Sequence, residues 1–193
     1  MKKENRYARF FTLEKRVNSK KKIAVLKSEM LPEFFAELIA DAEIDRSLKA
    51  LIVTSISGGL RITEALSLKK GDFYPEDDIL FAESSVLKKR KDDERLIMIH
   101  PAAKDFLWQY VQDKIGPLFG YTRDGALKAV KRVFDVEGIC NHSWRHTMIS
   151  FFLFEVNFSR EKTAKLMHVS VNIIDRYAHL NEKKALREAF AVR

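Results

Sequence analysis

The sequence predicts a mostly helical α+β domain with a small antiparallel sheet on one edge. Apolar residues recur at helical spacing on both sides of the middle of the chain, whereas between residues 78 and 99 the apolar runs become short and are separated by polar turns. With 193 residues, 46% of them hydrophobic and 32% charged, the chain is long enough to close one core and has the balance of a folded protein. We therefore expect one domain.

The predicted helices are marked by apolar faces and by residues that begin or end helices. Ser28 and Thr122 suit an N-cap, Pro101 suits a first turn, and Gly58 with Gly59 suits the end of a helix. The helices are expected from 28 onward, over 46–57, from about 61 to 71, from 101 and from 122 onward, and over 143–156, 159–167, 170–179 and 182–192.

The sheet is expected where the apolar runs are shortest. Residues 79–81 and 96–99 have the composition of strands, 85–87 is a candidate third strand, and the polar stretch 88–94 turns the last hairpin. Strands joined by a short turn pair antiparallel, so this region predicts a small antiparallel sheet.

The net charge is concentrated at the N-terminus. Residues 1–27 carry ten Lys or Arg against two Glu, while the remaining 166 residues hold 25 basic and 25 acidic side chains. A basic arm beside a neutral body suits a polyanion, because each neutralised phosphate releases counterions. The alternative interpretation of this arm is a solvated, partly disordered tail.

The location of the protein is indicated by what the sequence lacks. Cys140 is the only cysteine, so no intramolecular disulfide can form, and neither a secretory signal nor an apolar run near the roughly 18 residues of a membrane span is found. The sequence therefore predicts a cytoplasmic protein that does not enter a membrane.

Three short segments carry residue types that suit phosphate chemistry. Arg61 stands at a helix start between Gly-Leu and Glu-x-Leu-x-Leu, His142 and Arg145 form a His-x-x-Arg motif, and His168 is followed nine residues later by Tyr177. The second arginine and the second histidine are 23 residues apart. In this order and spacing the segments resemble the arginine box, the His-x-x-Arg box and the second histidine with nucleophilic tyrosine of the tyrosine recombinase (phage integrase) family. The resemblance implies the fold of that family's catalytic domain.

Elementary chemistry explains why a tyrosine nucleophile needs arginines. A phenol with a pKa near 10 is ionised in only about one molecule in a thousand at pH 7, a deficit of about 4 kcal/mol. Two guanidinium groups on the oxygens of one phosphodiester ease the approach of the Tyr177 phenolate and hold the charge of the transition state, and Arg61 with Arg145 are the candidates. A phosphotyrosine conserves the energy of the phosphodiester, so neither ATP nor a metal ion nor another cofactor is expected.

The resemblance also implies roles for the two histidines. His142 acts as a base or hydrogen-bond partner near the phosphate, and His168 is a second donor that helps to orient Tyr177. Two positions depart from the family pattern: Met167 replaces the usual glycine before the second histidine, and Ile174 stands where threonine is common. The departures concern the local backbone and the activation of the tyrosine rather than the reactive groups.

A lysine on the predicted hairpin completes the implied set, because the family takes the proton for the leaving 5′ oxygen from such a residue. Lys88, Lys89 and Lys91 are candidates, and aligning 94–97 with the family's strand places the lysine position at Arg90, one residue from either neighbour. We favour Lys89, since arginine is too weak an acid for this step.

Each of these residues also has an ordinary interpretation. His142 and His146 are four residues apart and could bind a metal ion, but Ser143 replaces the glutamate of the zinc-protease helix. His179 has a structural role in the favoured interpretation, and Trp144 is expected in the core. Only the joint occurrence of the motifs favours catalysis.

The predicted organisation is a basic arm over 1–27, a tyrosine recombinase catalytic domain over 28–180 and a tail helix over 181–193. The predicted function is site-specific breakage and rejoining of duplex DNA, by a protein that is monomeric in solution and tetrameric on DNA. The family's usual N-terminal core-binding domain is not expected before Ser28, so the resemblance leaves two alternatives open: an excised or naturally short catalytic domain, or one of the family's minimal members, which consist of little else. Two rivals stay open: a type IB topoisomerase-like nicking-closing enzyme, and a degenerate relative that binds DNA without cutting it.

Overall fold

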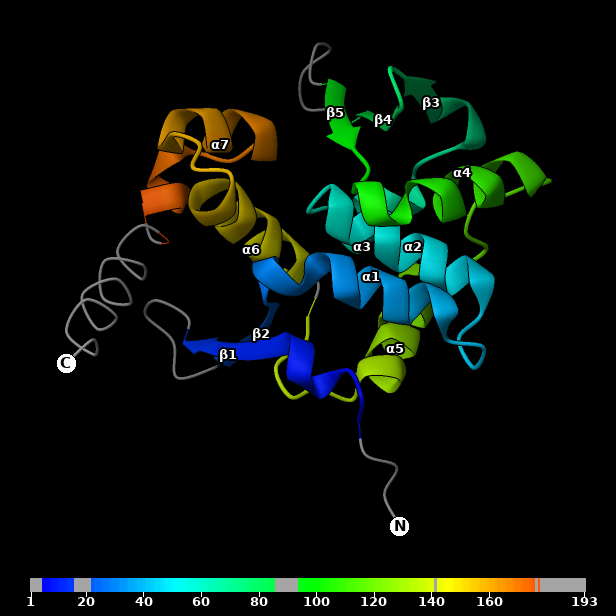
Figure 1. Ribbon diagram of the computed structural model, residues 1–193, viewed down its shortest axis with the longest axis horizontal. Helices are drawn as coiled ribbons and strands as arrows, with labels where there is room; N and C mark the ends of the chain where they lie inside the picture. The colour runs from blue at the N-terminus through cyan, green and yellow to red at the C-terminus, as the bar shows by residue number, and fades with distance from the viewer. Residues whose placement is uncertain (1–4, 16–21, 86–93, 141, 176, 178–193) are drawn as a thin grey trace.

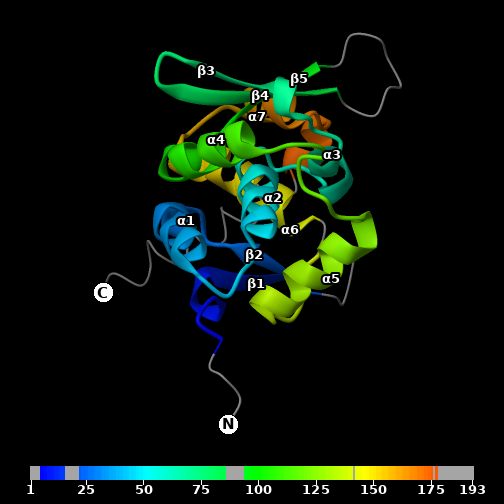
Figure 2. The same cartoon turned by 90° about the vertical axis from the view of Figure 1, so that its right-hand side faces the viewer.

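A computed structural model describes residues 5–15, 22–85, 94–140, 142–175 and 177. Its helices are α1 (Leu31–Ala40), α2 (Arg46–Ser57), α3 (Ile62–Leu66), α4 (Lys104–Asp113), α5 (Arg123–Phe134), α6 (Ser143–Ser150) and α7 (Arg160–Met167). Its strands are β1 (Phe11–Lys15), β2 (Lys22–Leu26), β3 (Phe73–Glu76), β4 (Ile79–Ser85) and β5 (Glu94–Met98). The two sheets lie at opposite ends of the helical body (Figures 1 and 2). The predicted α+β class is confirmed.

Helix α2 is the centre of the core. It packs against α1, α3, α4, α5 and α6, and every residue from Leu48 to Ser57 is buried. A helix enclosed in this way is apolar on most sides, which agrees with its sequence. The Asp45 carboxylate caps it by accepting a hydrogen bond from the Leu48 backbone N–H at 3.0 Å. The predicted bounds 46–57 are confirmed, as is the helix predicted over 159–167, which begins one residue later.

Other predicted helices are shorter than their sequence patterns. The first α-helix begins at Leu31 after a 3-10 turn over Ser28–Met30, and α3 ends at Leu66 rather than near Gly71. The helix predicted over 143–156 has nearly the predicted length, but only α6 is α-helical, and the chain continues as a π-helical turn over Phe151–Glu155. The described part of the chain contains no helix that is long and apolar enough to cross a membrane.

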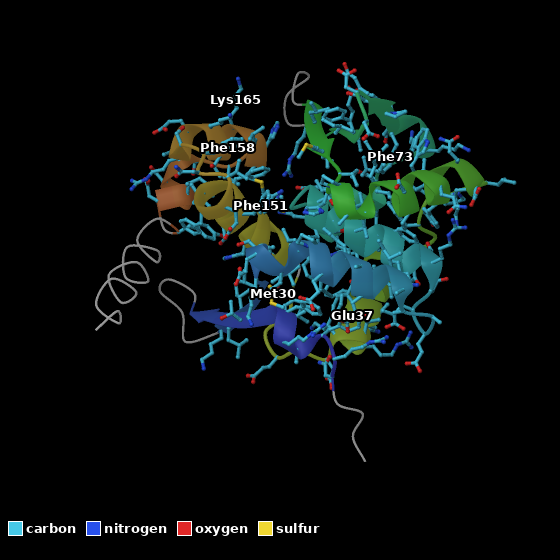
Figure 3. The ribbon with its side chains drawn as sticks, viewed as in Figure 1. Met30, Glu37, Phe73, Phe151, Phe158 and Lys165 are labelled. Carbon is cyan, nitrogen blue, oxygen red and sulfur yellow. The ribbon has the colours of Figure 1, made fainter. Side chains whose placement is uncertain are left out.

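The sheet of strand order β3-β4-β5 is antiparallel throughout, as predicted. Of the candidate strand at 85–87, Ser85 is the last residue of β4, and residues 86–87 lie outside the described residues. Strand β3, which contains Pro75, was not predicted. Side chains alternate along β5: Arg95 and Ile97 are buried against the helices, whereas Leu96 and Met98 are about half exposed. Phe73 of β3 is also buried, at the junction of the sheet and the helices (Figure 3). Arg95 therefore lies on the inner face of the sheet, against the helical body.

The N-terminal region differs from the predicted separate arm over 1–27. Tyr7, Phe10 and Phe11 are buried, and β1 pairs with β2 in an antiparallel ribbon whose second strand is almost wholly buried. The backbone N–H of Leu26 donates to the Thr147 hydroxyl of α6 at 3.1 Å. The net charge of the segment gives no sign of these aromatic residues, whose burial stabilises the domain. This described part of the segment therefore belongs to the domain.

Candidate active site

The turn that leads into Arg61 is built for close packing. Gly59 has φ +54°, a conformation that L side chains rarely adopt, and a Cβ placed there would lie 2.5 Å from the Cε atom of Met167 and 3.0 Å from the Cβ atom of Met148. The turn is held by the Leu60 N–H, which donates to the Ser55 carbonyl at 2.8 Å. Glycine thus allows the end of α2 to lie directly against α6 and α7.

The buried carboxylate of Glu64 joins the two candidate arginines. Its Oε1 accepts a hydrogen bond from Arg61 Nη1 at 2.7 Å, and its Oε2 accepts one from Arg145 Nη2 at 2.9 Å and one from the Arg61 backbone N–H at 2.9 Å. Arg145 also donates from Nε to the Gly59 carbonyl at 3.1 Å. The sequence motifs that contain Arg61 and Arg145 are therefore brought together.

The two guanidinium groups differ in exposure. The Arg61 side chain is 49% exposed and the Arg145 side chain 8% exposed. Arg61 therefore presents its charge to solvent, while Arg145 forms the inner wall of the site. An anion arriving from solution would meet Arg61 first.

The pKa of Glu64 reflects this arrangement. Burial tends to raise that pKa, but the charge of Arg145 and the hydrogen bonds from Arg61 outweigh it, so the pKa of Glu64 lies below its usual value. Burial lowers the pKa of Arg145, against the opposing charge of Glu64. Glu64 is thus an anion at neutral pH, and it holds the arginines by charge-assisted hydrogen bonds.

Tyr177 packs against α6, the helix that carries Arg145. The residue is 7% exposed, and its ring packs on that of His146, with ring centroids 5.0 Å apart. The phenol is close enough to Arg145 for the two groups to interact electrostatically. Ile174, one helical turn before it, is fully buried and anchors the segment.

The two predicted histidines occupy helix ends. His142 precedes α6 at the N-cap position, one turn before Arg145, and is half-buried. His168 ends α7 in the left-handed conformation, with φ +48°, and is exposed. Met167 before it is fully buried against Gly59, so the methionine that replaces the family's glycine fills the space beside the arginine turn. Helices α6 and α7, whose ends carry the two histidines, are in contact and lie next to each other (Figure 1).

Other predicted residues have a mixed outcome. Lys88, Lys89, Arg90 and Lys91 and also His179 lie outside the described residues. Trp144 is 2% exposed, which confirms its place in the core. Across the described ranges there is no group of three or more His, Cys, Asp or Glu side chains that could hold a metal ion.

Solved structures of three DNA recombination enzymes share this fold. A XerH site-specific recombinase, in a post-cleavage complex with a palindromic difH substrate, superposes with a TM-score of 0.65 at 22% identity over 87% of this chain. The catalytic domain of bacteriophage HP1 integrase gives a TM-score of 0.58 at 22% identity, covering 81% of this chain and 88% of that one. A Tn1549 transposon integrase bound to circular intermediate DNA gives 0.56 at 12% identity, covering 83% of this chain and 66% of that one.

The chain has the fold of a tyrosine recombinase catalytic domain. It spans about half the length of the XerH chain, of which it covers 52%. No protein-family model and no curated protein matches the sequence.

Two residues of the candidate site were not assigned a role from the sequence. Glu64 stands three residues after Arg61 at the start of a helix, the spacing at which a carboxylate reaches back to the N-cap backbone, and that spacing was the available signal. Arg95 is a third arginine of the cluster, with Nη1 3.8 Å from Glu64 Oε2. Its position in phase with Ile97 on β5 could have predicted that it faces inward.

Proposed function

We propose that this protein is a site-specific DNA recombinase or integrase that breaks and rejoins duplex DNA through a 3′-phosphotyrosine at Tyr177. The observation that carries the proposal is the carboxylate of Glu64, which holds Arg61 and Arg145 in one place while Tyr177 packs beside α6. The folds of XerH and of the HP1 and Tn1549 integrases support the same class of reaction.

The charges suit one phosphodiester. Arg61, Arg95 and Arg145 surround Glu64, so these four groups carry three positive charges and one negative charge, a net charge of +2. A phosphodiester carries one negative charge and gains a second as the phosphorane-like transition state forms. Preorganised guanidinium groups stabilise that added charge more than they stabilise the bound substrate, which is the requirement for catalysis.

In the proposed step, the Tyr177 oxygen forms a bond to phosphorus while the bond from phosphorus to the 5′ oxygen breaks. The phenol gives up its proton, for which His142 is the candidate acceptor, while His168 donates a hydrogen bond to the phosphate, and the leaving 5′ oxygen takes a proton from Lys89. Attack of a 5′ hydroxyl on the phosphotyrosine reverses these transfers and rejoins a strand. No net oxidation occurs and no nucleotide cofactor is consumed.

The proposed partner is double-stranded DNA, with a monomer in solution and a tetramer on paired sites. The N-terminal lysines would follow the DNA backbone and raise affinity without reading sequence. Replacing Lys2, Lys3, Lys20 and Lys21 with glutamine should flatten the dependence of DNA affinity on salt. An unchanged salt slope would remove this segment from the interface.

The test of the proposed chemistry is trapping of the covalent complex. Nicked suicide duplexes with candidate sites, incubated in EDTA and run on a denaturing gel, should give a protein–DNA band. The band should vanish in Tyr177→Phe and persist in the matched control Tyr74→Phe, whose hydroxyl bonds Glu83 on the exposed sheet. Loss of the band in both variants or in neither would contradict the assignment of the nucleophile.

The arginine pair is tested in the same assay. Arg61→Ala and Arg145→Ala should reduce the band by about 100-fold or more, since each removes a charged donor to the transition state. Arg46→Ala is the control for Arg61, because Arg46 has a similar exposure of 47% and pairs with Asp113 far from the site. Relaxation of supercoiled DNA without a partner site would instead favour the topoisomerase, and DNA binding without any covalent band would favour the degenerate relative.

A further inference from the structure

Arg95 is the most deeply buried charged residue of the cluster. The residue is 3% exposed, and its Nη2 donates to the Gly58 carbonyl and lies 3.5 Å from the sulfur of Met167. Its Nη1 is 3.8 Å from Glu64 Oε2, which is an ion pair without a hydrogen bond. Among the described residues, neither Nε nor Nη1 of Arg95 has a hydrogen-bond partner.

Such a placement is unfavourable for folding. A buried guanidinium with unmet hydrogen bonds loses its hydration without full compensation. Arg145 is also nearby, and burial together with the charge of Arg145 lowers the pKa of Arg95 to about 10. The group still carries its charge at neutral pH. A cation held beside another cation in the interior serves no evident purpose in stability.

The contacts of Arg95 instead connect three parts of the recombinase-like site. Gly58 belongs to the turn before Arg61, Glu64 holds both candidate catalytic arginines, and Met167 precedes His168. Arg95 is the second residue of β5, the strand that follows the lysine-bearing residues 86–93. One side chain therefore links the sheet to the turn before Arg61, to α3 and to α7.

We propose that Arg95 is a positioning residue for strand transfer, an inference that rests on the proposed function above. Its guanidinium also interacts with the carboxylate of Glu64. Because one carboxylate then faces three guanidinium groups, its negative charge does not fully neutralise Arg61 and Arg145. Arg95 also fixes β5 against the turn before Arg61, through the hydrogen bond to the Gly58 carbonyl. Arg95 does not touch the DNA in this proposal, because it is enclosed by α3, α7 and the sheet.

The experiment compares single-turnover cleavage of the nicked suicide duplex at saturating DNA with DNA affinity. Arg95→Met keeps the approximate volume and the apolar stem while removing the charge. Cleavage should slow by about 100-fold, the scale of a misplaced catalytic group, while the dissociation constant for DNA stays within about twofold. Arg95→Lys restores the charge and should cleave at least about tenfold faster than Arg95→Met.

Lys49→Met is the matched control. Lys49 is another buried cation, 8% exposed, that donates to a backbone carbonyl, that of Ile39 at 2.7 Å, but it lies outside the site. Its loss should leave the cleavage rate within about twofold of the unaltered protein. Far-UV circular dichroism and thermal melting of each variant check that the fold persists.

The outcomes separate the two proposals. If the unaltered protein forms no covalent complex, the proposed function fails. If it does form the complex, three results would overturn the positioning role. Arg95→Met could cleave at the rate of the unaltered protein, or its DNA affinity could fall by as large a factor as its cleavage rate. Alternatively, Arg95→Lys or Lys49→Met could cleave as slowly as Arg95→Met. A slow Arg95→Met with normal affinity and a faster Arg95→Lys supports the positioning role.

Discussion

Replacing Glu64 with glutamine is the sharpest perturbation of the buried cluster. The substitution keeps the size of the side chain but removes the charge that holds Arg61 at 2.7 Å and Arg145 at 2.9 Å. The amide nitrogen would also face guanidinium donors. Glu64 and Arg145 are 6% and 8% exposed at their side chains, so solvent replaces little of the lost interaction.

The magnitude follows from that burial. Removing one partner of a buried ion pair costs about 3–5 kcal/mol, because the other charge remains buried. For a protein of this size each kcal/mol shifts the melting temperature by about 2–4 °C, so Glu64→Gln should lower it by about 6–20 °C. Glu33→Gln is the control: Glu33 pairs with Arg9 at 2.9 Å, but both side chains are 55% exposed, and the loss should stay within about 1 kcal/mol.

Differential scanning calorimetry and urea titration at pH 7 provide the measurement. If Glu64→Gln costs no more than Glu33→Gln, the carboxylate does not hold the arginines together, and the charge argument for the site is refuted. A loss confined to DNA cleavage, with unchanged stability, would likewise contradict the reasoning.

The remaining predictions concern pH, backbone and the N-terminal segment. The pKa of Glu64 in the folded protein lies below its unfolded value, so the carboxylate stabilises the fold above about pH 4.3, and this contribution is lost as pH falls through the folded pKa. The difference in unfolding free energy between the unaltered protein and Glu64→Gln should therefore narrow in acid, and a widening difference would contradict this. Gly59→Ala should cost about 1–3 kcal/mol in urea melts, whereas Gly71→Ala, with nothing within 4 Å of the added Cβ, should cost little. Tyr7→Phe removes the 2.8 Å hydrogen bond to the buried Asp41 and should destabilise by about 1–3 kcal/mol, in contrast to the neutral effect expected of a tail residue.

The sequence by itself determined the elements and motifs that depend on neighbours along the chain. Helix α2 was predicted at its observed bounds because a cap, an apolar face and a glycine stop are all local signals. The arginine, His-x-x-Arg and histidine–tyrosine segments were recognised by residue type and spacing. The inward face of β5 could have been predicted in the same way, from alternation.

Only the tertiary structure decided which charged groups meet. Glu64 and Arg145 are 81 residues apart in the chain and Arg95 and Met167 are 72 apart, and no periodicity encodes such contacts. The same holds for the N-terminal ribbon, whose Leu26 bonds Thr147 across 121 residues. Local patterns record what each segment favours alone, whereas burial beside distant residues sets the charge state, the exposure and the partners of the side chains that form the site.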